Sequence, residues 1–185
     1  MTSLPKSEKE KMLDGELYNA EDPVLIADRA HAAELQQRYN SIAHLPSTHF
    51  LLLQQILGSV GEESVIRSPF FFDYGYNIHL GRHVFLNFNC VLLDVNRITI
   101  GDKTQIGPGV QIYAADHPLD PALRRANLES GRPVHIGANV WIGGGSILLP
   151  GISVGDDAVI GAGSIVTHDV PAGAKVFGSP ARIRD

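Results

Sequence analysis

Apolar residues recur at every sixth position in the last third of the chain. From Val134 onward this beat falls on Ile136, Ile142, Leu148, Val154, Ile160 and Val166. Small or branched residues also recur at every sixth position, each four residues after one of these apolar residues. Glycine directly follows four of the six apolar residues. An α-helix cannot keep a period of six, because its 3.6 residues per turn rotate the apolar side round the axis. Short strands joined by tight corners can keep it, and three of them complete one triangular coil of about eighteen residues.

The same pattern predicts how successive coils stack. Ile136 should lie on Val154, Ile142 on Ile160, and Leu148 on Val166. Upstream the beat continues, less regularly, through Leu80, Leu86, Leu92, Ile100, Ile106 and Ile112. A two-residue slip between Leu92 and Ile100 predicts a bulge or wider corner near Asp94 to Arg97. The chain is therefore predicted to be mainly β, a parallel β-helix from about 60 to 180. A sandwich of short strands is the alternative.

The beat is interrupted by the segment YAADHPLDPALR, which begins at Tyr113. Some twenty irregular residues, about 113–133, separate two regular parts of the repeat. A solenoid tolerates an insertion at a corner because each coil contacts only its neighbours. Insertions of this length are more often functional than accidental, so we expect the chemistry to lie here.

Residues 1–59 follow a different pattern and predict a small helical cap, with the β-helix in 60–185. SEKEKMLDG indicates a charged helix that stops at Gly15. Asp22 as N-cap and Pro23 at the first helical position predict a second helix through DPVLIADRAHAAELQQRYNSI. Ser47 is the predicted N-cap of a third helix that ends at Gly58.

Composition removes several classes of partner. The 185-residue chain has a net charge of -5 and no dense run of Lys or Arg, so nucleic acid and anionic membranes are not expected to bind. The single cysteine, Cys90, excludes an internal disulfide and is expected in the core. The charged start and the absence of an 18-residue apolar run favour a cytoplasmic protein.

Together with the repeat, the segments GELYNAEDP and FFDYGYNIHLG carry a resemblance over nearly the whole chain. The chain resembles the hexapeptide-repeat acyltransferases, and within them the maltose and galactoside O-acetyltransferase branch. The resemblance implies left-handed coils, and direct transfer of acetyl from acetyl-CoA, as co-substrate, to a hydroxyl of a sugar. A homotrimer is expected, because a pocket on one flat solenoid face needs a neighbour to close it.

In that branch a His-Pro element at the start of the inserted loop carries the catalytic base. Asp116, His117 and Pro118 match it. The resemblance therefore implies that His117 is the general base, and an imidazole can accept a proton from an attacking hydroxyl at neutral pH. Without the resemblance, a single histidine beside a proline is an ordinary surface residue.

The acceptor residues are implied by the same match. Asp73, Asn87 and Asp94 fall where family members hydrogen-bond sugar hydroxyls or steady the base. Arg29 matches an acceptor-contacting arginine of the helical cap. Asp73 replaces the serine of some relatives, which leaves the acceptor's identity open. The simpler interpretation is that Asn87 and Asn89 sit at corners, where asparagine tolerates left-handed φ.

For the donor, NVWIGGGSILLPG and VIGAGSIVTHDVP match the wall that lies beside coenzyme A in the family. Trp141, Gly144, Ala162 and Thr167 are placed along its pantetheine arm, and Arg182 and Arg184 near its phosphates. Many relatives have lysine where this chain has His168, so one phosphate contact is expected to be weaker. A backbone N–H near the WIGGG corner is expected to bind the carbonyl oxygen of the donor.

Two other functions stay open. One is acetylation of a different hydroxylated molecule, such as an antibiotic or an amino acid. The other is a catalytically silent or metal-binding solenoid, since gamma-type carbonic anhydrases hold a metal with three histidines on such coils. That class predicts two histidines five apart within the coils, whereas His44 and His49 lie in the cap and His79 and His83 are four apart. No metal is therefore expected.

Overall fold

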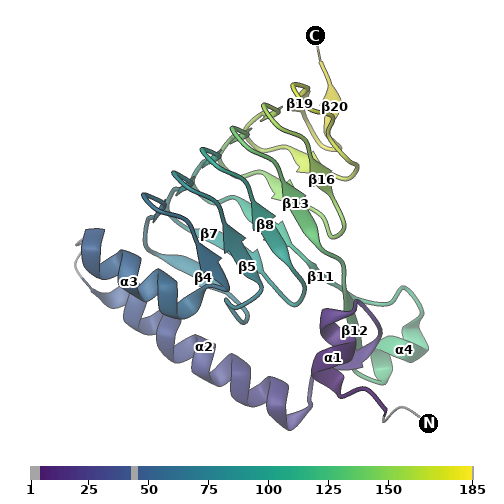
Figure 1. Ribbon diagram of the computed structural model, residues 1–185. Helices are drawn as coiled ribbons and strands as arrows, with labels where there is room; N and C mark the ends of the chain where they lie inside the picture. The colour runs from purple at the N-terminus through teal and green to yellow at the C-terminus, as the bar shows by residue number, and fades with distance from the viewer. Residues whose placement is uncertain (1–4, 43–45, 185) are drawn as a thin grey trace.

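The computed structural model describes residues 5–42 and 46–184, and a prism of stacked coils is its main feature (Figure 1). Each coil contributes one strand to each of three faces, and the strands within a face run parallel except for the terminal pair of β19 and β20, so the predicted parallel β-helix is confirmed. The first face consists of β2 (Ser59–Val60), β5 (Ile78–Leu80), β8 (Ile98–Ile100), β13 (Val134–Ile136) and β16 (Ser153–Val154). The second consists of β3 (Val65–Ile66), β6 (Phe85–Leu86), β9 (Gln105–Ile106), β14 (Trp141–Ile142), β17 (Val159–Ile160), β19 (Lys175–Phe177) and β20 (Arg182–Ile183). The third consists of β4 (Phe70–Phe72), β7 (Cys90–Leu93), β10 (Gln111–Tyr113), β15 (Ile147–Leu148) and β18 (Ile165–Val166).

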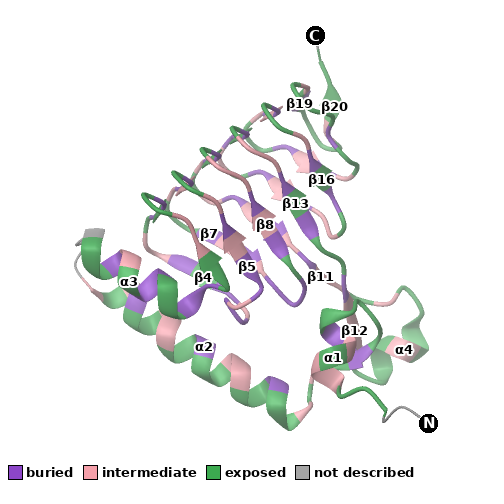
Figure 2. Ribbon diagram, viewed as in Figure 1, coloured by how far each residue is buried: buried purple, intermediate pink, exposed green. Residues whose placement is uncertain are grey.

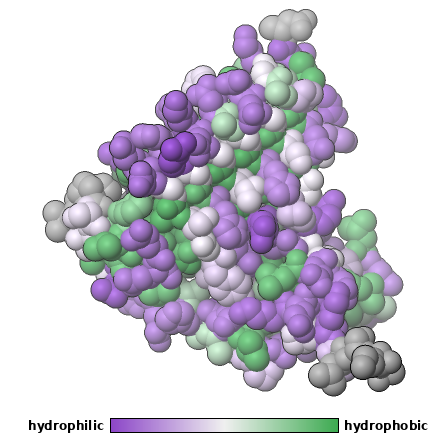
Figure 3. Space-filling model, in the orientation of Figure 1, coloured by the Kyte–Doolittle hydropathy of each residue, from purple (hydrophilic) through white to green (hydrophobic). Residues whose placement is uncertain are grey.

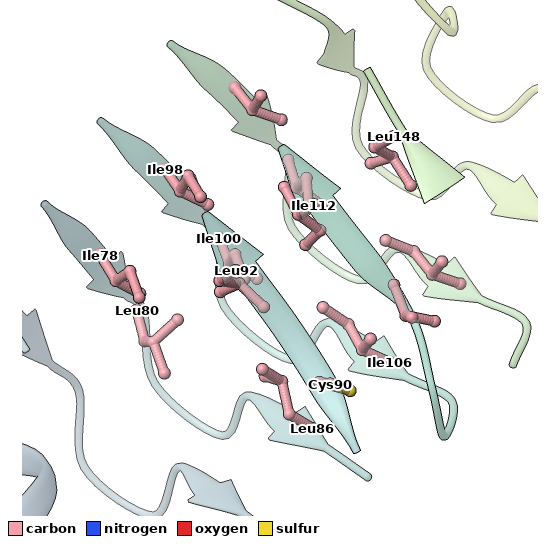
Figure 4. Close-up of a cluster of buried hydrophobic side chains, with 14 of the residues drawn as sticks. Ile78, Leu80, Leu86, Cys90, Leu92, Ile98, Ile100, Ile106, Ile112 and Leu148 are labelled. Atoms are coloured by element: carbon pink, nitrogen blue, oxygen red, sulfur yellow. The ribbon is translucent and has the colours of Figure 1, made fainter. Parts of the chain in front are cut away.

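The register between coils is the one that the six-residue beat predicts. Ile136 pairs with Val154, Ile142 with Ile160, and Leu148 with Val166. The residues of the beat point inward and are buried, and Figure 4 shows several of them stacked along the axis. Cys90 is among them, as expected. Figure 2 shows buried residues, in purple, alternating with more exposed ones along the strands of the solenoid, and Figure 3 shows a hydrophobic band that runs obliquely across the coils.

Glycine at the corner between the second and third faces lets neighbouring coils approach closely. We call this corner the second corner; it includes Asn87–Asn89, Gly107–Gly109, Gly143–Gly145 and Gly161–Gly163. A Cβ on Gly143 would lie 2.4 Å from the backbone nitrogen of Ala162, closer than any side chain allows. Asn89 has φ of 60° there, as its corner position predicts, whereas Asn87 is not among the residues with positive φ.

The corner between the third face and the next coil is the wider one; we call it the third corner. In two coils it consists of Asp73–Asn77 and Asp94–Arg97, which confirms the predicted slip. The carboxylate of Asp94 explains its shape: Oδ1 accepts from the backbone N–H groups of Asp73 and Tyr74 at 3.0 and 2.9 Å, and Oδ2 accepts from that of Asn77 at 3.2 Å. One buried carboxylate thus ties two successive coils together at this corner.

Three helices precede the solenoid: α1 (Glu8–Leu13), α2 (Pro23–Ser41) and α3 (Pro46–Ile56). Asp22 caps α2 as predicted, since its side chain accepts from Val24 N–H at 3.0 Å. The predicted N-cap at Ser47 is wrong, because α3 begins at Pro46 and Ser47 lies inside its first turn. In Figure 1, α2 and α3 lie along the end of the solenoid that carries β4.

The inserted loop has more regular structure than its sequence suggests. It contains β11 (Ala115–Asp116), α4 (Pro121–Arg125) and β12 (Leu128–Gly131). Asp120 caps α4 and Pro121 opens it, which repeats the signal of Asp22 and Pro23. A strand of the cap that the sequence does not predict, β1 (Tyr18–Asn19), pairs antiparallel with β12. The insertion is therefore docked on the N-terminal segment.

Candidate functional site

His117 follows β11 at the turn of the insertion and is exposed. Its backbone N–H donates to Asp116 Oδ1 at 2.9 Å, and Asp116 Oδ2 forms an ion pair with Arg132 at 3.0 Å. Arg132 stands at the far end of the insertion, after β12. Asp116 therefore joins the beginning and the end of the loop and fixes the backbone that carries His117.

Two adjoining cavities lie between the insertion and the N-terminal segment. The smaller, of about 120 Å³, is lined by His117 together with Arg124 and neighbouring residues of α4 and β12. The larger, of about 250 Å³, is lined by Arg29 and Asp73 together with Tyr74 and Val95. Ala20, Glu21 and Glu129 line both cavities. The structure thus places His117 in one cavity and Arg29 and Asp73 in the adjoining one.

Arg29 projects from α2 and is held by two neutral acceptors. Its Nη1 donates to the hydroxyl of Tyr74 at 2.9 Å, and its Nη2 donates to the carbonyl oxygen of Ala20 at 2.8 Å. Tyr74 belongs to a second buried cluster, apart from the solenoid core, with Met12, Tyr18, Leu25 and Val95. Because Tyr74 and Val95 of this cluster also line the larger cavity, the helical cap that packs on them forms part of the cavity wall.

Asp73 and Asp94 occupy different levels of the third corner. Asp73 is half-buried and lines the cavity, whereas Asp94 is fully buried beneath it and holds the backbone of the corner. Burial raises the pKa of Asp73 to about 6, aided by the charge of Glu129 and opposed by Arg29. Burial likewise raises the pKa of Asp94 to about 7, against the backbone N–H groups that it accepts. Asp73 can contact a ligand, and Asp94 contacts the loop that carries Asp73.

Glu129 is a cavity residue that sequence reasoning missed. It lies opposite Tyr18 in the antiparallel pair of β12 and β1, and the Tyr18 hydroxyl donates to its Oε2 at 3.1 Å. Its carboxylate and burial together raise the pKa of Tyr18, burial being the larger cause. The only signal in the sequence is that Glu129 is one of the few acids in the insertion.

Asn87 lies at the second corner and does not line either cavity. Its side-chain oxygen accepts from the adjacent Phe88 N–H at 2.9 Å.

Gly144 and Ala162 share this corner in later coils. Gly143 N–H donates to Ile160 and Gly145 N–H to Pro108, at 2.7 and 2.9 Å; among the described residues, the N–H of Gly144 between them meets no backbone acceptor. Gly144 therefore offers a backbone donor at the corner.

The other expected donor residues spread over the C-terminal coils. Trp141 is 60% exposed on the second face. Thr167 and His168 lie at the third corner, where Thr167 Oγ1 and His168 Nδ1 are 2.8 Å apart. His168 and Arg182 line one cavity of about 340 Å³ at the C-terminal end, and Arg184 follows, exposed, on the same terminal hairpin.

Several of the expected site residues fall on two corners that border the same face, whereas Arg29 lies on α2, Trp141 on the second face, and Arg182 and Arg184 on the terminal hairpin. Asn87, Gly144 and Ala162 occupy the second corner, whereas Asp73, the insertion, Thr167 and His168 occupy the third. Between them, the outward row of the third face consists of Phe71, Val91, Gln111, Ile147 and Ile165, partly or fully exposed and apolar except for Gln111. Within one chain, the residues of the second corner do not line the cavity of His117 or the adjoining cavity of Asp73.

Two further searches cover residues 5–42 and 46–184. No three His, Cys, Asp or Glu side chains in this part of the chain cluster closely enough to hold a metal ion. His44, one of the histidines considered above, lies outside the described residues. None of the described helices has the length and apolar character needed to cross a membrane.

Comparison with known proteins finds similarity over the whole length. The family model described as the maltose acetyltransferase hexapeptide capping motif matches residues 11–61, and that of the hexapeptide repeat of succinyl-transferase matches 133–168. Nodulation protein L of Rhizobium meliloti is 58% identical, over 98% of this chain and 100% of its own. The crystal structure of a maltose O-acetyltransferase from Clostridium difficile is 45% identical with a TM-score of 0.96, over 97% of both chains. A galactoside acetyltransferase in complex with coenzyme A is 34% identical with a TM-score of 0.93, over 98% of this chain and 91% of its own.

Proposed function

The chain belongs to the maltose and galactoside O-acetyltransferase family of hexapeptide-repeat proteins, and from this premise we propose that it transfers acetyl from acetyl-CoA to a hydroxyl of a sugar. The observation that carries the proposal is the position of His117. It lines a cavity that shares Ala20, Glu21 and Glu129 with the adjoining cavity of Arg29 and Asp73. A sugar held by Arg29 and Asp73 would have a hydroxyl within reach of the imidazole.

His117 acts as general base in this proposal. It takes the proton of the acceptor hydroxyl as the oxygen attacks the thioester carbon, and the carbon–sulfur bond then breaks. The proton passes from the imidazole to the departing thiolate, so that free coenzyme A and an acetate ester are the products. Transfer is direct, with no acetyl-enzyme.

The donor lies along the C-terminal coils. The relative in complex with coenzyme A supports the identity of the donor, and the exposed Arg182 and Arg184, which are suited to phosphates, support its place. Thr167, His168, Ala162 and Trp141 would line the rest of the path. The N–H of Gly144, which meets no backbone acceptor among the described residues, would bind the carbonyl oxygen as it gains negative charge.

The site is completed between subunits of a homotrimer. Asn87, Gly144 and Ala162 stand on one corner of the chain, and His117, Asp73 and Asp94 belong to another. The third face between these corners, whose outward row is apolar except for Gln111, would pack against a neighbour. Each site would then combine the third corner of one chain with the second corner of the next.

The test is release of free thiol from acetyl-CoA with and without a panel of sugars. We expect release only when a hydroxyl acceptor is present, and loss of release in His117→Ala. Thiol release that does not depend on the acceptor, or no release with any of them, would contradict the proposed function.

A further inference from the structure

The turn that follows His117 is held by one side chain of α4. Arg124 Nη1 donates to the carbonyl oxygens of Pro118 and Leu119, at 2.6 and 2.7 Å. A guanidinium is always charged, and hydrogen bonds from a charged donor are stronger than those between neutral groups. Among the described residues, no other side chain bonds to the backbone of Pro118 or Leu119. The turn therefore depends on Arg124 for its polar side-chain contacts.

The short helix α4 brings Arg124 to this position. Asp120 caps the helix by accepting from Ala122 N–H at 2.8 Å, and Pro121 occupies the start of the helix. The backbone N–H of Arg124 donates to the carbonyl oxygen of Asp120 at 3.2 Å, which turns the chain back toward Pro118. The side chain of Arg124 thus meets the turn that precedes its own helix.

Packing adds little to the turn. Leu119 is 94% exposed, and Pro118 has no backbone N–H with which to bond the rest of the loop. On the other side, His117 N–H donates to Asp116, which is itself paired with the far end of the insertion. His117 is therefore restrained through Asp116, which precedes it in the chain, and through Arg124, which holds the residues after it.

Arg124 and His117 also line the same cavity, of about 120 Å³. Resting on the proposed function, we propose that Arg124 is a positioning residue, which holds the turn so that the imidazole of His117 stays aligned with the acceptor hydroxyl. An error of about 1 Å in the position of a catalytic group can cost about a hundredfold in rate. An exposed charged side chain contributes little to global stability. Loss of Arg124 should therefore affect turnover far more than folding.

The experiment measures thiol release by Arg124→Met, which keeps a long side chain of similar helix propensity without its charge. At saturating acetyl-CoA and with a sugar that the wild type uses, we expect kcat to fall at least about tenfold. KM for the sugar and Kd for coenzyme A should change less than about twofold, because in this role Arg124 contacts neither reactant.

Arg125→Met is the matched control. Arg125 is the next residue of α4 and is exposed, and its side chain makes no hydrogen bond or ion pair with any residue that the structure describes. It should keep wild-type kcat. Amide hydrogen exchange of segment 116–120 gives a readout that needs no turnover, and it should be faster in Arg124→Met than in the wild type or in Arg125→Met.

The outcomes separate this inference from the function on which it rests. Normal kcat in Arg124→Met, or unchanged exchange of the segment, overturns the positioning role and leaves the acetyltransferase proposal standing. A higher KM for the sugar at unchanged kcat indicates direct contact with the acceptor and also overturns it, as does an equal loss of kcat in Arg125→Met. If Arg124→Met does not fold, Arg124→Gln is measured against the same outcomes. Absence of thiol release by the wild type with every sugar overturns the proposed function instead.

Discussion

Tyr18 and Glu129, 111 residues apart in the chain, face each other across an antiparallel strand pair and share a hydrogen bond of 3.1 Å. This contact joins the N-terminal segment to the insertion in the middle of the solenoid. It places Glu129 in the same cavity as Arg29 and Asp73, and its neighbour cavity holds His117. The two cavities are therefore assembled from three separate parts of the sequence.

The first prediction concerns His117→Ala. We expect kcat to fall by about 10² to 10⁴, because a positioned base acts in the transition state, while affinity for coenzyme A changes little. Steady-state kinetics with a donor titration measures both. His31→Ala, on the exposed side of α2, is the control and should keep wild-type turnover. Near-normal kcat in His117→Ala would remove this residue from the mechanism.

The second prediction concerns assembly through the third face. Light scattering should give the mass of a trimer, and Ile147→Lys should shift it toward monomer, because a charge then replaces a partly exposed apolar side chain in the outward row of this face. Activity should fall in parallel, since each site needs two chains. Gln37→Lys, on the exposed side of α2, adds the same charge away from this face and should stay trimeric. A fully active monomer would exclude the shared site.

The third prediction concerns the donor phosphates. His168 lines a cavity with Arg182, and His168→Lys puts an ammonium there. An exposed ion pair adds at most about 1 kcal/mol, so coenzyme A should bind up to about fivefold more tightly at low salt. The gain should fade as salt rises, because exposed charges are screened over about 8 Å at physiological ionic strength. Acceptor preference should not change. If donor affinity at low salt equals that of wild type, the phosphates lie elsewhere.

The fourth prediction concerns stability and pH. Burial raises the pKa of Asp94 to about 7 from its ordinary value of 3.8, and Asp73 beside it shifts in the same direction. The folded protein therefore binds a proton that the unfolded chain has released between these values. The contribution of Asp94 to the free energy of unfolding is full below about pH 4 and is lost as pH rises through 7.

Asp94→Asn removes this titration. Its free energy of unfolding should fall less steeply than that of wild type between pH 5 and 8, measured in urea at one protein concentration. The substitution should also cost about 1 to 3 kcal/mol, since an amide N–H2 replaces one acceptor of the backbone N–H groups. Parallel pH profiles for the two proteins would show that Asp94 is not the titrating group.

Much of the fold could be predicted because one physical constraint repeats. Inward side chains at a period of six determine strand, corner and register together, so the pairing of Ile142 with Ile160 is readable from the sequence. The fold class, a left-handed parallel β-helix, is confirmed, with handedness supplied by the family rather than by the period. The start of α2 could be predicted from Asp22 and Pro23, whereas α3 begins at Pro46, two residues before the first helical position that an N-cap at Ser47 predicts.

The cavity could be predicted only in part, because its contacts do not repeat. Arg29 and Asp73 were expected near the acceptor and do share one cavity. Glu129 was missed, since the pairing of β1 with β12 depends on how the insertion folds back on the cap and follows no period. The roles of these residues toward a ligand remain predictions, as does the part of Asn87 at the other corner.

The docking of the insertion on β1 has a consequence for how such chains evolve. Neither β1 nor the insertion from β11 to β12 supplies a described side chain to the main buried cluster of the solenoid. Substitutions at Glu21 or Glu129 can therefore change which molecules enter the cavity without loosening the coils. New acceptor preferences can accumulate on an unchanged scaffold, one surface residue at a time.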